Sequence, residues 1–251
     1  GKNRFFGDLR VRQAVQAGID VNAIIEVVYQ GAATPLAGTL PIASWGYNPA
    51  LKPTTYNPGM AARLLDSAGW VDTDNDGIRN CFRCATAADG TSLVLNFSIA
   101  YSEQRMRAAE MIARQLQRIG IGVSLNAESD PRHQTFDLHL GGYTYDSPYT
   151  FDPDQSALFA RDADIVGQMG NIGSYHNPAL DALLEQARTV PDCDVSTRAA
   201  LYHEAQVLLA QDLPMFGLYA VHDFYVARGI QGFAPQPGKP FWNLLNWSVS
   251  S

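Results

Sequence analysis

The chain has 251 residues, of which 46% are hydrophobic and 17% charged, enough to bury the core of one large domain or two small ones. Its net charge of −7 argues against a nucleic-acid partner, which needs a basic face, and does not favour an anionic membrane surface. No apolar run reaches the roughly 18 residues that span a bilayer, so the chain is not expected to cross a membrane.

Two helices are predicted in the first thirty residues. Asp8 is a suitable N-cap, and apolar residues recur at helical spacing from there to Ile19. Asp20 can cap a second helix, which is expected to stop at Gly31.

A proline-rich stretch over residues 31–56 has little periodicity and predicts a long ordered loop. Asn57 and Pro58 then suit the N-cap and first position of a short helix that runs to Ala68, with Gly69 just beyond its end.

A βαβ unit is predicted in the middle of the chain. Residues 72–92 are rich in turn formers, and apolar residues alternate over 93–99 as in a strand. A helix is expected over 103–119, followed by a second alternating strand over 121–125. Because the connections are tight, the two strands should be parallel.

Strands and helices alternate in the rest of the chain as well. A strand is expected over 136–140, a helix from the Asn177 cap to about residue 188, and a longer helix to about 211 that Asp194 or Ser196 caps. Residues 214–220 and 224–228 have the composition of strands, and 242–249 form an apolar tail. These elements predict a mixed α/β lobe.

Five stretches together carry a resemblance to a known family. They read D-L-R-V-R-Q-A-V-Q-A-G-I-D at 8–20, A-A-R-L-L-D-S-A-G-W at 61–70, D-N-D-G-I at 74–78, Q-L-Q-R-I-G-I at 115–121 and Y-H-N-P-A-L-D at 175–181. Their order and spacing are similar to those of the family 5 extracellular solute-binding proteins, the oligopeptide, dipeptide and nickel receptors of ABC importers.

The resemblance implies a type II periplasmic-binding-protein-like α/β fold, with a mixed β-sheet flanked by helices. It implies that these segments come from the carboxy-terminal half of a longer protein. Residues 1–221 would form the substrate-binding lobe, and 222–251 would return to the missing first lobe. The location it implies is periplasmic or extracellular, with a lipid anchor left open for the full-length precursor.

The function implied is that of the substrate-binding component of an ABC importer. Its partners would be a membrane permease and a small peptide or similar solute, with oligopeptides, dipeptides, sugars and chelated nickel all open. No cofactor is expected. The sequence contains no zinc-protease helix, nucleophile elbow or Walker loop, so an enzyme is not expected. A solute sensor, an accessory binding module and a secreted hydrolase remain as alternatives.

The strongest candidate for ligand binding follows the strand over 136–140. Gly141 and Gly142 permit close backbone approach and lead into Tyr143, Tyr145 and Asp146. In the family the equivalent stretch lines the cleft, and in peptide receptors the Asp that matches Asp146 meets the α-amino group of the ligand. The alternative is a solvated Asp at a turn beside packed tyrosines.

Trp45 is a second candidate, at the rim of the cleft. An exposed Trp beside Gly46 suits a binding surface, although the same ring could cover the core instead.

Asp72, Asp74 and Asp76 occupy alternate positions of a sequence that matches the first half of a calcium loop. The twelfth position should be a bidentate Glu but is Arg83, so calcium is only a weak candidate and no metal is assigned. The alternative is an Asp-rich turn before a strand.

Cys81 and Cys84 could form a redox pair, half of a zinc site or a small-loop disulfide. A redox pair needs a helix N-terminus, and zinc needs two further ligands. The oxidising compartment that the resemblance implies favours the disulfide. Cys193 has no assigned role.

Overall fold

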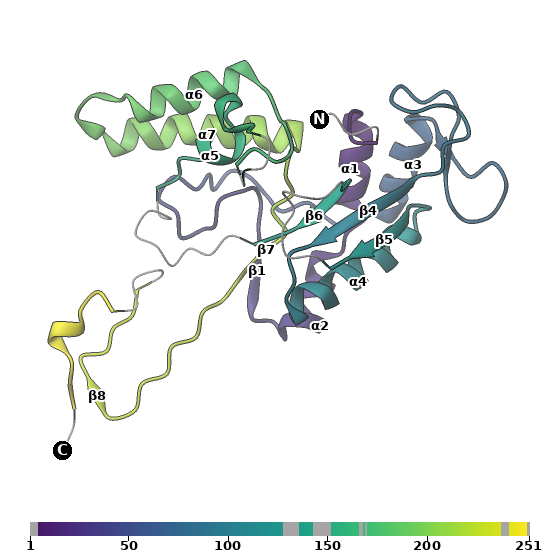
Figure 1. Ribbon diagram of the computed structural model, residues 1–251. Helices are drawn as coiled ribbons and strands as arrows, with labels where there is room; N and C mark the ends of the chain where they lie inside the picture. The colour runs from purple at the N-terminus through teal and green to yellow at the C-terminus, as the bar shows by residue number, and fades with distance from the viewer. Residues whose placement is uncertain are drawn as a thin grey trace.

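The computed structural model describes residues 5–127, 136–142, 152–165, 168, 170–236 and 241–249. A three-stranded sheet with helices packed beside it forms the main body, a helical hairpin lies next to it, and the carboxy-terminal segment extends away from both (Figure 1). The architecture is therefore the mixed α/β arrangement that the sequence predicts.

The sheet has the order β5-β4-β6, and all its pairings are parallel. The central strand is β4 (Val94–Ile99), with β5 (Gly122–Asn126) on one side and β6 (Leu138–Leu140) on the other. The helix α4 (Glu103–Gln117) connects β4 to β5. The predicted βαβ unit is confirmed.

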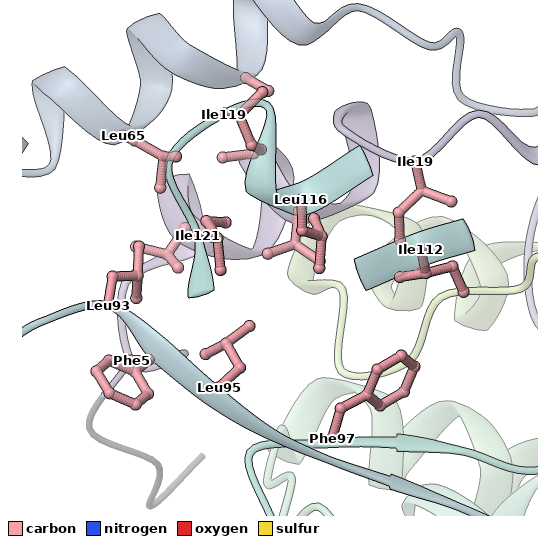
Figure 2. Close-up of a cluster of buried hydrophobic side chains, with 14 of the residues drawn as sticks. Phe5, Ile19, Leu65, Leu93, Leu95, Phe97, Ile112, Leu116, Ile119 and Ile121 are labelled. Carbon is pink, nitrogen blue, oxygen red and sulfur yellow. The ribbon is translucent and has the colours of Figure 1, made fainter. Parts of the chain in front are cut away.

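The core lies between this sheet and the helices. Alternate residues of β4 point into it, and α4 presents Ile112 and Leu116, which are both almost fully buried (Figure 2). Ala109 and Ala113 of the same helix are also buried. The apolar side chains of the β4 region that fill the core are Leu93, Leu95, Phe97 and Ile99.

Three helices of the amino-terminal part pack on the same core: α1 (Leu9–Ala17), α2 (Val21–Tyr29) and α3 (Pro58–Ser67). Each begins where the sequence predicts. The carboxylates of Asp8 and Asp20 and the amide oxygen of Asn57 accept backbone N–H groups of the first turn, which would otherwise lack partners.

Two short antiparallel pairs each have one strand, β1 or β3, in a stretch that was predicted as loop or turn. One joins β1 (Ala33–Pro35) to β7 (Tyr219–Val221), and the other joins β2 (Trp70–Val71) to β3 (Asn80–Cys81). Two or three residues give no recognisable alternation, so pairs of this length leave no signal in the sequence.

The helical hairpin consists of α6 (Pro178–Arg188) and α7 (Val195–Asp212), as predicted, and a short α5 (Ser156–Phe159) packs against it. Single 3₁₀ turns lie at Arg161–Ala163 and Pro191–Cys193. The hairpin has a hydrophobic cluster of its own, which contains Phe159, Leu180, Leu184, Ala187, Tyr202, Ala205 and Leu209.

The carboxy-terminal segment differs most from expectation. The strand expected over 214–220 begins only at Tyr219, and the strand expected over 224–228 is wrong. Residues 221–232 are exposed, and those between β7 and β8 (Ile230–Gln231) belong to no strand. Past β8 come a 3₁₀ turn at Leu244–Asn246 and β9 (Ser248–Val249), which pairs with β8.

Candidate functional site

The carboxyl ends of β4 and β6 meet at one edge of the sheet. Ile99 is opposite Leu140, and Ala100 N donates to Leu140 O at 2.9 Å. In open α/β sheets, ligands bind beyond the carboxyl ends of parallel strands, so this edge is the first place to look for a site. Gly141 and Gly142 continue directly from β6 at this edge.

Tyr143, Tyr145 and Asp146 follow these glycines but lie outside the described residues. The structure therefore does not test their placement, and their role stays a prediction. It does describe the residues on both sides of the stretch 143–151, and these show what holds its two ends.

Arg105 lies beside the first end. It comes from the first turn of α4, and its guanidinium donates a hydrogen bond to Ala100 O. A Cβ atom placed on Gly142 would lie 3.8 Å from Arg105 Nε, so the backbone there passes close to the cation.

His139 on β6 also lies beside this end, since a Cβ atom placed on Gly141 would lie 3.0 Å from its Nε2. Its Nδ1 lies 3.3 Å from Oγ of the buried Ser98. Burial lowers the pKa of His139, and the nearby positive charge of Arg105 lowers it further. Both effects favour the neutral form of the imidazole at this edge.

The second end is held by the helical hairpin. Arg198 of α7 forms an ion pair with Asp152, with Nη2 3.1 Å from Oδ2. Its guanidinium carbon also lies 5.1 Å from the centroid of the Trp45 ring. Trp45 in turn packs edge-on against Tyr202, with centroids 5.8 Å apart. Trp45, a candidate from the sequence, is thus contacted by the same arginine that pairs with Asp152, just beyond the stretch 143–151.

Backbone contacts hold the Trp45 loop in this place. A Cβ atom on Gly46 would lie 2.5 Å from Pro153, so only glycine permits this approach. Gln206 Nε2 donates to Gly46 O at 2.6 Å, and Asn48 N donates to Gln206 Oε1 at 3.1 Å. Trp45 itself is 36% exposed, so one part of its ring packs on Tyr202 and another faces outward.

The site residues that the sequence did not reveal are Arg105, His139, Asp152, Arg198, Tyr202 and Gln206. Several of their contacts join distant parts of the chain, such as that between Gln206 and Gly46, which are 160 positions apart, and no local pattern marks such a contact.

Asp72, Asp74 and Asp76 lie away from this region, in the turn between β2 and β3. They are exposed, and one carboxylate oxygen from each falls within 4.8 Å of the others. Asp72 already accepts hydrogen bonds from Asn75 N at 2.8 Å and Gly77 N at 3.1 Å, as an Asp-rich turn requires. The cluster gives no reason to assign a metal.

Cys81 and Cys84 are joined in a disulfide, with Cα atoms 5.5 Å apart, and Cys193 is free and exposed. The bridge closes the turn beyond β3, where Phe82 N donates to Gly69 O at 2.7 Å. It is a feature of this turn and not of the sheet edge. The oxidation state in the native compartment stays a prediction.

A family model described as "Bacterial extracellular solute-binding proteins, family 5 Middle" matches residues 1–163. The chain belongs to this family. The matched range includes the sheet, its carboxyl edge and the Trp45 loop.

Curated relatives agree with this assignment. A dipeptide-binding protein of Pseudomonas aeruginosa is 28% identical over 96% of this chain, and one of Escherichia coli is 28% identical over 92% of it. The chain spans only 43% and 41% of these two proteins.

Solved structures show the same fold. The oligopeptide-binding protein AppA of Bacillus subtilis, in complex with a nonapeptide, has a TM-score of 0.80 at 24% identity and covers all of this chain. NikZ of Campylobacter jejuni, in complex with Ni(L-His), has a TM-score of 0.78 at 24% identity over 98% of it. This chain corresponds to 49% and 50% of those two. Within the described part of the chain, no helix is long and apolar enough to span a membrane.

Proposed function

We propose that this chain is the ligand-binding lobe of the substrate-binding component of an ABC importer, which captures peptides or a similar small solute and delivers them to a membrane permease. The observation that carries the proposal is the family 5 match over residues 1–163, together with relatives that are named for dipeptide binding. Those relatives are solute-binding proteins, so the function proposed is binding without catalysis. A periplasmic or extracellular location goes with it.

Residues 1–221 would form this lobe, and 222–251 would return to the other half of the receptor. The exposed apolar side chains of the carboxy-terminal segment support this division. Val226 is 94% exposed and Leu245 fully exposed, whereas isolated soluble surfaces rarely gather such residues. The fact that the chain spans under half of its curated relatives' length gives these side chains a natural partner, the remaining half of the protein.

Asp146 would anchor a cationic group of the ligand, most simply the α-amine of a peptide. A carboxylate suits an ammonium group, which has three donors and a full positive charge. Trp45, Tyr143 and Tyr145 would provide flat walls around it, because aromatic rings add contact area at low entropic cost. Trp45 supports this arrangement, since Arg198 contacts its ring and also pairs with Asp152, which is close in sequence to Asp146.

The test uses the full-length receptor with Asp146→Asn, and calorimetry with free-amine peptides and their N-acetylated forms. A charge-assisted hydrogen bond contributes about 1.5–3 kcal/mol, so free-amine peptides should bind about tenfold to a hundredfold more weakly. Acetylated peptides should be nearly unaffected.

The outcomes separate three cases. Equal weakening of both peptide forms would show that Asp146 supports the loop and not the ligand. No weakening of either form would place the anchor elsewhere. Failure of the unmodified receptor to bind any peptide would overturn the proposed ligand class.

A further inference from the structure

Arg198 makes more contacts than a surface ion pair requires. Its Nη2 donates to Asp152 Oδ2 at 3.1 Å and to the Tyr202 hydroxyl at 3.2 Å, and its Nε donates to Ala187 O at 3.0 Å. The side chain is only 17% exposed. Arg198 therefore joins α7, the end of α6 and the residue that follows the stretch 143–151.

Two aromatic rings flank the same guanidinium. Its central carbon lies 5.1 Å from the Trp45 centroid and 5.7 Å from the Tyr202 centroid. A planar, delocalised cation can stack on rings while its edge donates hydrogen bonds, which the compact ammonium of lysine cannot do. The environment of Arg198 is thus specific for arginine.

From these contacts we propose that Arg198 is a positioning residue for the ligand cleft. It fixes the Trp45 ring and the Asp152 end of the candidate stretch in one arrangement, and ligand affinity depends on it although it does not itself touch the ligand. The proposal rests on the proposed function, because Trp45 must face the ligand for its position to matter.

A second contact links the loop that carries Trp45 to the segment that carries Asp152. Gly46 and Pro153 are in direct contact, with no room for a Cβ atom on Gly46. Arg198 lies beside this contact and binds a neighbour on each side, Trp45 and Asp152. Its pairing with Asp152 also offsets the charge of that carboxylate, which accepts a further hydrogen bond from Asp154 N at 3.0 Å.

The experiment uses the full-length receptor with Arg198→Lys and Arg198→Gln. The matched control is Arg188→Gln, which removes an exposed arginine that pairs with Glu185 on α6. Ala-Phe and pentaalanine serve as probes in calorimetry. The receptor is also labelled with 5-fluorotryptophan, and Trp45→Phe assigns the fluorine signal of Trp45.

Without ligand, both Arg198 variants should shift or broaden the Trp45 signal, while Arg188→Gln leaves it unchanged. Both Arg198 variants should bind the two peptides about 3-fold to 30-fold more weakly than the unmodified receptor does. This range is the free energy of one cation–π contact expressed as a change in affinity. The control should bind within about twofold of the unmodified receptor. The thermal midpoint is measured in parallel, so that the loss of affinity can be compared with the folded fraction.

An unchanged Trp45 signal in both Arg198 variants would overturn the proposal. So would unchanged affinity in folded variants, or an affinity loss that the unfolded fraction fully accounts for. If the unmodified receptor binds neither probe, the peptide ligand class fails, and the ligand-free Trp45 signal alone then decides whether Arg198 positions this ring.

Discussion

Gln206 should be the side chain on which the placement of the Trp45 loop depends most. It lies on α7 and is only 2% exposed. Its amide accepts from Asn48 N at 3.1 Å and donates to Gly46 O at 2.6 Å. The perturbation is Gln206→Ala, which removes both contacts and keeps the helix.

The magnitude follows from the two backbone groups that lose their partners. Gly46 and Asn48 are both buried, so water does not freely replace the amide. Each unsatisfied buried group costs about 1–3 kcal/mol, and water entering the space left by the side chain recovers part of this. We expect the free energy of unfolding to fall by about 2–4 kcal/mol.

Urea unfolding followed by circular dichroism measures this loss. With a denaturant dependence of about 2 kcal/mol per molar, the midpoint should fall by roughly 1–2 M. Gln211→Ala is the control, since Gln211 is exposed on the same helix and its removal should change little. If Gln206→Ala unfolds at the same urea concentration as Gln211→Ala, the amide does not hold the loop and the reasoning is refuted.

Three further predictions concern other parts of the chain. Alkylation of the denatured, unreduced mature protein should label Cys193 alone, and labelling of all three cysteines would contradict the Cys81–Cys84 disulfide. The fold lowers the pKa of His139, so as the pH falls through the usual histidine pKa of about 6.5 the unfolded state takes up a proton before the folded state does, and the folded state loses stability. Between pH 7.5 and 5.5, His139→Asn should therefore lose less thermal stability than the unmodified protein. An equal loss in both would contradict this. The isolated 251-residue chain should bind peptides near the millimolar range or more weakly, about −4 kcal/mol, so micromolar binding by calorimetry would show that one lobe suffices.

Helix starts and the central sheet could be predicted because their causes are local. Asp8, Asp20 and Asn57 each accept N–H groups two or three positions ahead, so a short window of sequence contains the whole interaction. The alternation through Leu95 and Phe97 is equally local, since neighbouring residues of a strand face opposite sides.

The elements that were missed or wrong have distant causes. Ala33 pairs with Val221, far away in sequence, and the three residues of β1 show no pattern by themselves. Phe224–Arg228 has the composition of a strand, but a strand forms only where another strand satisfies its backbone groups. Composition indicates that a segment could form a strand, but it does not show whether another strand lies beside it.

The same limit applies to the candidate site. Trp45 was singled out as an aromatic residue beside a glycine, but whether it covers the core or faces a ligand depends on Arg198, Tyr202 and Gln206. None of these has a spacing that marks it as a neighbour of Trp45. The candidate was found from residue type, and its surroundings could come only from the fold.

The negative charge of the chain is concentrated in the residues that follow the candidate stretch. Residues 152–212 contain ten Asp and Glu but three Lys and Arg, a difference of −7, which equals the net charge of the whole chain. The other residues therefore have fifteen charges of each sign and cancel. A surface of one sign attracts ligands of the opposite sign over several ångströms. Residues 152–212 are thus the negative part of the chain, which suits the cationic ligand group that we propose at Asp146.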